Sequence, residues 1–324
     1  MFIGLALLFV FSVTIENKKE EKNLFPKSSL RKNINFSNQQ ENKFPASLPA
    51  WPLSKNKNVF NSTSTAVASL VIDVVTDKIL FEKNSEEVRS LASVTKLMSV
   101  MVLLDLPINW NSSTQIIEDD CDVSSHQLEV GDVMKLSDLW NAALIGSANN
   151  AIKALVRNSG ISQEKFVDLM NKKAKNLGLN SLSFSEPTGL SSYNIGNAKD
   201  VAGLLKEALK SEKILKALQI GQYFTNPLNN EKPRRIYSTN WLLTDWIPNK
   251  FSSDRIVGKT GFINASGYNF VVRLTDNKDH QIIVVILGAQ NNEARFSEAR
   301  DLADWIFKQY LWPDEEGYKQ LENK

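Results

Sequence analysis

The stretch Ser90-Leu-Ala-Ser-Val-Thr-Lys-Leu-Met98 places Ser93 three residues before Lys96, at the start of an apolar, helix-favouring run that Pro107 ends. On a helix this spacing puts both side chains on one face and within hydrogen-bonding reach. The lysine can accept the serine proton only if its pKa falls from about 10.4 towards neutrality. We expect burial, the helix N-terminus and a second cation to lower that pKa.

A second motif, Ser147-Ala-Asn149, lies in a break that Gly146 marks between two predicted helices. The Ser147 hydroxyl can relay a proton there, and the Asn149 amide can hydrogen-bond a substrate amide. Taken alone, the same residues are explained equally well by a helix cap or a turn at Ser147. This motif therefore indicates a catalytic site only in combination with Ser93-x-x-Lys96 and with a third motif, Lys259-Thr-Gly261.

The third motif, Lys259-Thr-Gly261, ends a predicted strand. Lys259 offers a charge for a carboxylate, and Gly261 leaves room for a substrate backbone to pair with the strand edge. Thr260 faces the other side of the strand, so spacing alone does not bring its hydroxyl to the site. The alternative is an exposed edge lysine before a turn.

Together the three motifs are typical of an enzyme that acylates its own serine and uses lysine where histidine is usual. Each is weak alone, since Ser-x-x-Lys also begins at Ser29, Ser54 and Ser162, whereas Lys-Thr-Gly occurs once. An isolated Ser-x-x-Lys is more often an N-cap serine with a solvated lysine. The apolar neighbours of Ser93 and Lys96 favour burial instead.

The composition argues against several other classes. A hydrophobic share of 42% in 324 residues suits a globular protein, and a net charge of +2 without a basic stripe gives no sign of nucleic-acid binding. The two histidines, His126 and His280, and the single Cys121 cannot supply spaced zinc ligands, and no Gly-x-Ser-x-Gly elbow is present. We therefore expect no metal and no cofactor.

The N-terminal region has a different character. Residues 1–15 are apolar and suit a signal peptide or an uncleaved signal anchor; a buried N-terminal segment is the alternative. Residues 16–58, rich in Asn, Lys and Ser, predict a disordered linker. We expect one folded domain at 59–312, a tail at 313–324, and an extracytoplasmic location with membrane contact only through the N-terminal segment.

Within the folded part, strands at both ends enclose a series of helices. This order predicts an α/β (α+β) fold in which one antiparallel sheet is closed by the two ends of the domain and carries an inserted helical lobe. A catalytic cleft would lie between sheet and lobe. The predicted strands are 66–75, 78–82, 255–259, 268–275 and 281–288, and the predicted helices are 91–106, 136–145, 148–157, 163–177, 198–210 and 292–310.

From 67 to 310 the sequence resembles the low-molecular-mass penicillin-binding DD-peptidases, the D-alanyl-D-alanine carboxypeptidase family. The resemblance rests on the three motifs in their flanking sequence and on two further segments. Those segments are Phe166-Val-Asp-Leu-Met-Asn-Lys-Lys-Ala174 with Leu177-Gly178, and Phe184-Ser-Glu-Pro-Thr-Gly-Leu190. The resemblance implies a β-lactamase/transpeptidase-like fold, a peptidoglycan stem-peptide substrate and β-lactams as covalent inhibitors.

The resemblance also implies a role for each motif residue. Ser93 would form the acyl-enzyme, Lys96 would accept its proton and Ser147 would assist proton transfer. Substrate would be held by Asn149, Lys259 and Thr260. The oxyanion hole would be the backbone N–H groups of Ser93 and Phe262.

Several activities remain open within this resemblance. The family implies a D-Ala-D-Ala carboxypeptidase, whereas Ser238-Thr-Asn240 with Trp241 and Trp246 looks closer to the branch of DD-endopeptidases that cleave cross-links. A β-lactamase would need a base for the deacylating water, for which Glu186 is the obvious candidate. A non-catalytic penicillin sensor would keep the serine and lysine yet deacylate very slowly.

Overall fold

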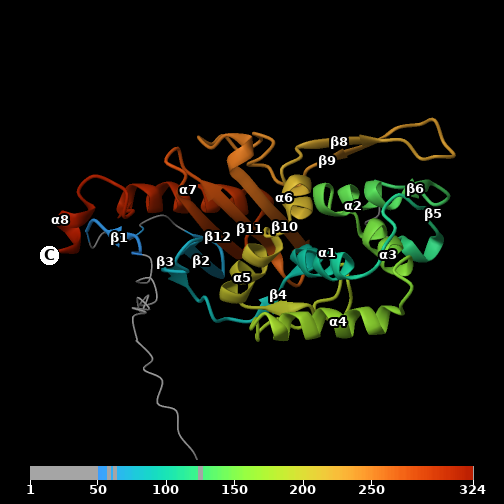
Figure 1. Cartoon of the computed structure of the whole chain (residues 1–324), viewed down its shortest axis with the longest axis horizontal. Helices are drawn as coiled ribbons and strands as arrows, with labels where there is room; N and C mark the ends of the chain where they lie inside the picture. Colours follow the sequence, from blue (N-terminus) through green and yellow to red (C-terminus); the bar gives the residue numbers. More distant parts are fainter. Residues whose placement is uncertain (1–49, 57–59, 61–63, 123–126, 324) are drawn as a thin grey trace, which may run out of the picture. The chain divides into compact units, whose positions relative to one another are not determined.

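The computed structural model describes residues 50–56, 60, 64–122 and 127–323. At the centre lies a five-stranded antiparallel sheet in the order β10-β11-β12-β2-β3 (Figure 1). The N-terminal hairpin thus completes a sheet begun by the C-terminal strands, which confirms the predicted architecture. The strands are β2 (Ala68–Asp73), β3 (Ile79–Lys83), β10 (Ile256–Ile263), β11 (Gly267–Thr275) and β12 (Gln281–Ala289).

Helices cover both faces of this sheet because alternate side chains of its strands are apolar on each side. Phe270 and Val272 pack with Phe296 of α7 (Asn292–Gln309) in one cluster. Val271 belongs to the other cluster, which includes residues of α5 (Ala198–Ala208) and α1 (Lys96–Asp105). α1 ends just before Pro107, as the restriction on residues preceding proline requires.

The helical lobe continues from the second face. Four further helices build it, and a 3-10 turn, η1, leads into α1. The helices are α2 (Leu136–Ile145), α3 (Asn149–Arg157), α4 (Gln163–Asn176) and α6 (Glu212–Leu218), and η1 spans Ala92–Thr95. The bounds of α2, α3 and α4 lie within two residues of the predicted helices, whereas α6 was not predicted.

Three short two-stranded pairs and two 3-10 turns add to the described fold. They are β4 (Arg89–Ser90) with β7 (Ile195–Gly196), β5 (Ser113–Gln115) with β6 (Val133–Lys135), β8 (Gln222–Thr225) with β9 (Arg234–Tyr237), and the turns η2 (Glu118–Asp120) and η3 (Ser253–Arg255). The β8–β9 hairpin contacts α2 (Figure 1). Sequence periodicity gave no indication of these short pairs.

The ends of the domain differ from expectation. β1 (Leu53–Ser54) pairs with β13 (Tyr310–Leu311), so the predicted linker 16–58 extends too far at its C-terminal end. The predicted tail 313–324 contains α8 (Tyr318–Glu322), because Tyr318 is buried and its hydroxyl donates to the backbone of residue 51. The predicted segment 1–15 lies outside the described residues. No helix in the described part of the chain is long and apolar enough to cross a membrane.

One buried ion pair joins the β8–β9 hairpin to the lobe. The guanidinium of Arg234 donates to both oxygens of Asp132 at 2.6 and 2.8 Å, and each side chain is at most 5% exposed. Asp132 also accepts from the backbone N–H of Glu129. Removing one partner would leave a charge buried without compensation.

We therefore expect Arg234→Ala to lower the free energy of unfolding by about 3–5 kcal/mol. The matched control is Arg235→Ala on the same strand, where the side chain is exposed and the loss should stay below about 1 kcal/mol. Urea denaturation of both variants measures the difference. Equal, small losses would show that the buried pair does not hold the hairpin.

Candidate active site

Ser93 lies in the 3-10 turn η1, which precedes α1, and Lys96 is the first residue of α1. This turn packs tightly on β10: a Cβ atom built on Gly261 would lie 2.6 Å from the carbonyl oxygen of Leu91 and 3.1 Å from the amide nitrogen of Ser93. Only glycine fits so close an approach. Gly261 therefore serves the packing of the serine turn against the strand, a purpose that the sequence did not indicate.

Lys96 is fully buried beneath Ser93. Its Nζ donates to Ser93 Oγ at 2.9 Å, to Asn149 Oδ1 at 2.6 Å and to the carbonyl oxygen of Thr188 at 2.6 Å. Three acceptors match the three protons of an ammonium group. A neutral amine would keep the two shorter bonds and turn its lone pair towards the serine hydroxyl, which is the geometry of a general base.

Burial lowers the pKa of Lys96 to about 7, and the negative charges of Glu186 and Asp122 act in the opposite direction. Desolvation disfavours the charged form of an amine, which explains the sign. We had expected the helix N-terminus and a second cation to contribute alongside burial. In the structure, burial is the main cause of the lowered pKa, and the two acids partly offset it.

Lys259 and Ser147 meet on the other side of the serine. Lys259, also buried, donates from Nζ to Ser147 Oγ at 2.7 Å and to the carbonyl oxygen of Thr260 at 3.1 Å. Burial, followed by the positive charges of Lys96 and Arg295, lowers the pKa of Lys259 well below its usual value. Ser147 reaches this contact from a left-handed backbone position, φ 59°, in the α2–α3 break.

The Lys-Thr-Gly motif lies inside β10 and not at its end, because the strand continues to Ile263. β10 is an edge strand, so one row of its backbone groups has no neighbouring strand within the sheet. Thr260 reaches the site from this edge: its Oγ1 is 2.6 Å from Oγ1 of Thr239. Phe262 is 45% exposed and stacks on Tyr268.

A cleft of about 630 Å³ collects these side chains between the sheet edge and the lobe. Its lining includes Ser93, Ser147, Asn149, Thr260, Gly261 and Phe262, all predicted from sequence, while Lys96 and Lys259 lie buried beneath it. The remaining lining residues are Gln127, Gly146, Gly189, Leu190, Thr239, Ile263, Asn264 and Arg295. Within the described ranges, no group of three His, Cys, Asp or Glu side chains could hold a metal ion.

Arg295, which sequence analysis missed, is a further basic residue of the site. It lies in the first turn of α7 and donates from Nη1 to the carbonyl oxygens of Gly261 and Asn269. Burial lowers its pKa to about 10. Nothing in the local sequence marks it, since α7 meets β10 only through the folded sheet. The charged Arg295 beside the cleft favours an anionic ligand, which would also favour the charged form of Lys259.

The loop 184–191 borders the cleft through Gly189 and Leu190, and Glu186 fixes the course of this loop. The Glu186 carboxylate accepts from the backbone N–H groups of Thr188 at 2.6 Å and Gly189 at 2.5 Å, and from the side chain of Asn194 at 2.6 Å. These bonds fix the position of the Thr188 carbonyl oxygen, which accepts a hydrogen bond from Lys96. Gly189 (φ 93°) permits this course, since an added Cβ would lie 2.0 Å from the Ala92 oxygen.

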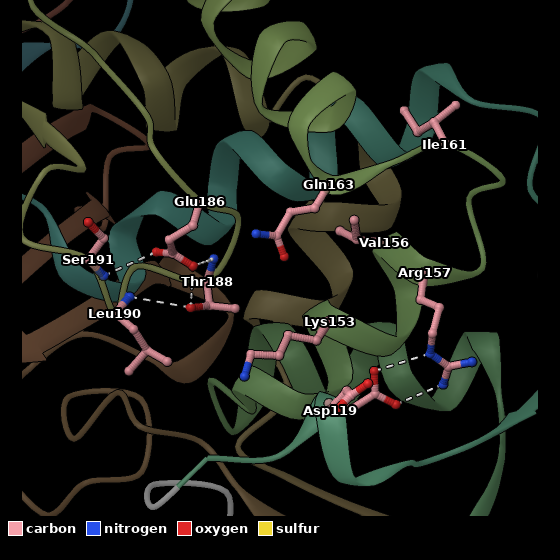
Figure 2. A pocket seen from close by; sticks show the side chains of 11 residues that line it. Asp119, Lys153, Val156, Arg157, Ile161, Gln163, Glu186, Thr188, Leu190 and Ser191 are labelled. Carbon is pink, nitrogen blue, oxygen red and sulfur yellow. Dashed lines mark hydrogen bonds and ion pairs between the residues drawn. The ribbon is translucent and has the colours of Figure 1, made fainter.

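Glu186 lines a separate cavity of about 740 Å³ and does not line the cleft of Ser93. Figure 2 shows this cavity, with Glu186 and Thr188 on one side and Lys153 and Arg157 of α3 on the other. Leu190 borders both spaces. A carboxylate that is hydrogen-bonded to its own loop and lines a different cavity does not fit the role of a base for a deacylating water.

The fold, and a serine hydroxyl hydrogen-bonded to a buried lysine, define the class of penicillin-interacting serine peptidases. Comparison with known proteins gives the family. Residues 55–291 match the family model described as D-alanyl-D-alanine carboxypeptidase, Peptidase S11. The chain belongs to this family. Its members act on peptidoglycan, which lies outside the cytoplasmic membrane, so the place of action is the cell envelope.

Individual relatives carry two different names. The D-alanyl-D-alanine endopeptidase of Haemophilus influenzae is 33% identical over 65% of this chain and 70% of its own length. The D-alanyl-D-alanine carboxypeptidase DacF of Bacillus subtilis is 30% identical over 81% of this chain and 67% of its own length.

Solved structures share the fold. The Streptomyces K15 DD-transpeptidase aligns with a TM-score of 0.69 at 23% identity, over 77% of this chain and all of that one. Penicillin-binding protein D2 of Listeria monocytogenes, in its cefotaxime-bound form, aligns with a TM-score of 0.65 at 25% identity, over 77% of this chain and all of that one.

The low pKa of Lys96 predicts the pH dependence of serine acylation. If the neutral amine of Lys96 acts as the base, the acylation rate should be low below pH 7, rise through about pH 7 and level off above it. Lys96→Arg should abolish acylation, since arginine stays protonated. Stopped-flow acylation by a fluorescent penicillin gives both results, and circular dichroism checks the fold of the variant. Near-normal acylation in Lys96→Arg would exclude Lys96 as the base.

Lys259 gives a separate prediction. Lys259→Ala should lower kcat/KM for a D-Ala-D-Ala peptide by about 30-fold or more, because the cleft loses a desolvated cation for the substrate carboxylate. Lys250→Ala is the control, since Lys250 is half exposed and pairs with Asp304. An equal rate in the two variants would make Lys259 a structural residue.

Proposed function

We propose that the protein is a serine D-Ala-D-Ala carboxypeptidase that trims peptidoglycan stem peptides through an acyl-serine intermediate. The observation that carries the proposal is Lys96, a buried lysine with a pKa of about 7, 2.9 Å from the hydroxyl oxygen of Ser93. A surface lysine would remain protonated at neutral pH and could not accept the proton.

In this mechanism Ser93 Oγ attacks the carbonyl carbon of the penultimate D-alanine while Lys96 takes the hydroxyl proton. The C–N bond then breaks, and the leaving amine receives, through the Ser147 hydroxyl that Lys259 hydrogen-bonds, the proton that Lys96 took. Water then attacks the serine ester while the neutral Lys96 takes a proton from it, and Lys96 gives that proton to Ser93 Oγ as the ester C–O bond breaks. The N–H groups of Ser93 and Phe262 are the proposed donors to the oxyanion.

Substrate binding is proposed to use the remaining motif residues. Asn149 would hold a substrate amide while its Oδ1 keeps Lys96 in place. Lys259 and Thr260 would bind the terminal carboxylate, supported by the positive charge of Arg295. Burial, followed by repulsion from Lys96 and Arg295, lowers the pKa of Lys259, and a carboxylate brought into the cleft would favour the charged form of that lysine against both.

DD-endopeptidase activity is the second candidate. It is favoured by relatives named D-alanyl-D-alanine endopeptidase in three organisms, at 29–33% identity. A cross-link through a diamino dicarboxylic acid also carries a carboxylate beside the scissile nitrogen, so the same cations suit both substrates. β-Lactamase activity has less support, because Glu186 is bound to its own loop. We also propose that residues 1–15 direct export or anchor the chain.

Intact-mass spectrometry after incubation with penicillin tests the nucleophile. The wild-type protein should gain one long-lived adduct, because the leaving group of a β-lactam stays tethered and blocks water. Ser93→Ala should gain none. Labelling that persists in Ser93→Ala would reject the assignment, and rapid loss of the wild-type adduct would indicate a β-lactamase.

Two defined muropeptides separate the remaining activities. A monomer with a pentapeptide stem should lose one D-alanine to a carboxypeptidase, whereas a cross-linked dimer without a terminal D-Ala-D-Ala should become two monomers only with an endopeptidase. Mass spectrometry of the products, with Ser93→Ala as the blank, gives the ratio of rates. Cleavage of the dimer alone would replace the carboxypeptidase proposal with the endopeptidase one.

A further inference from the structure

A third cavity, of about 670 Å³, lies beside the cleft and takes no part in the chemistry above. The β8–β9 hairpin and the turn that follows it form its walls. None of its lining residues is charged; they are Gly221, Gln222, Tyr237, Ser238, Trp241, Thr244 and Trp246. The lining combines aromatic rings with uncharged hydrogen-bonding groups.

Two stacked tryptophans dominate this cavity. The rings of Trp241 and Trp246 have centroids 5.6 Å apart and an interplanar angle of 30°. The Trp241 ring also stacks on Phe296 of the core, with ring centroids 5.6 Å apart and an interplanar angle of 20°. The position of Trp241 is therefore fixed by core packing. Trp246 is 73% exposed. A large aromatic ring held in water on a rigid support indicates a binding surface and not a packing residue.

The hairpin extends the aromatic surface. Tyr237, at the cavity wall, is 55% exposed, and the guanidinium of Arg235 lies 4.6 Å from its ring centroid. Around the rings, Gln222, Ser238 and Thr244 offer amide and hydroxyl groups. A sugar ring has an apolar C–H face and a rim of hydroxyl and acetamido groups. That chemistry matches an aromatic platform with an uncharged polar rim.

Two consecutive residues line the cavity and the cleft, one each. Ser238 lines the cavity, whereas Thr239 lines the cleft and lies 2.6 Å, Oγ1 to Oγ1, from Thr260. A peptidoglycan stem peptide is joined covalently to a glycan strand at its N-terminus. An extended stem of a few residues, at about 3.3 Å each, would let a sugar lie on a surface beside the cleft while the end of the stem is at Ser93.

We propose that the cavity of Trp241 and Trp246 binds sugar rings of the glycan strand whose stem peptide occupies the cleft. This inference rests on the proposed peptidoglycan substrate. The stacked tryptophans would contact the C–H face of a sugar, and Gln222, Ser238 and Thr244 would hydrogen-bond its substituents. The protein would thereby favour stems still attached to glycan over free peptides.

Trp246→Ala tests the proposal, because an exposed side chain can be removed with little effect on folding. Glycan binding is measured by calorimetry with peptide-free glycan chains, using Ser93→Ala protein with and without Trp246→Ala. Loss of one stacking face should weaken binding about three- to tenfold, and Trp246→Tyr should restore most of it. Trp51→Ala, which removes another exposed tryptophan outside the cavity, should bind as the parent does.

Kinetics on the active enzyme separates sugar from peptide recognition. Trp246→Ala should raise KM for a glycan-linked stem and leave a sugar-free D-Ala-D-Ala peptide and penicillin acylation unchanged. An equal loss on both substrates, unchanged glycan binding, or an equal effect of Trp51→Ala would overturn the proposal. Failure of the proposed function has a different signature, since wild-type protein would then bind glycan without acylating Ser93.

Discussion

The burial of one amine governs the site. Lys96 has no contact with bulk water, and its three hydrogen-bond partners come from η1, α3 and the loop 184–191. Desolvation brings its pKa to about 7, while Glu186 and Asp122 keep it from falling further. The balance leaves a base that is neutral in part at physiological pH yet still basic enough to accept a hydroxyl proton.

Close backbone contacts make that burial possible. Gly261 brings β10 against the serine turn, and Gly189 brings the loop 184–191 against the same turn from the other side. A side chain at either position would separate the layers, admit water around Lys96 and raise its pKa. The glycines of the motifs therefore act on the chemistry through packing and solvent exclusion, and they need not contact a substrate to do so.

The sequence predicted the central sheet, the lobe helices and the motif residues that now surround one cleft, because periodicity and short motifs are local signals. It did not predict that Arg295 joins the site, that β10 continues past Gly261, or that Glu186 is bound to its own loop. Arg295 reaches the site from 26 to 34 residues along the chain, which no local pattern reveals. The end of β10 is set by its pairing with β11, and Glu186 by hydrogen bonds within its own loop, and neither contact has a periodic sequence signal. The β8–β9 hairpin was missed because its strands are short and partly exposed.

An NMR titration of lysine side chains tests the account most directly. Protein labelled with ¹³C at lysine Cε should show one resonance that titrates near pH 7 and disappears in Lys96→Arg, with the lower value caused by burial. A Lys96 resonance that titrates near 10, like a solvated lysine, would contradict the account, because the proposed base would then be protonated throughout the working range of the enzyme.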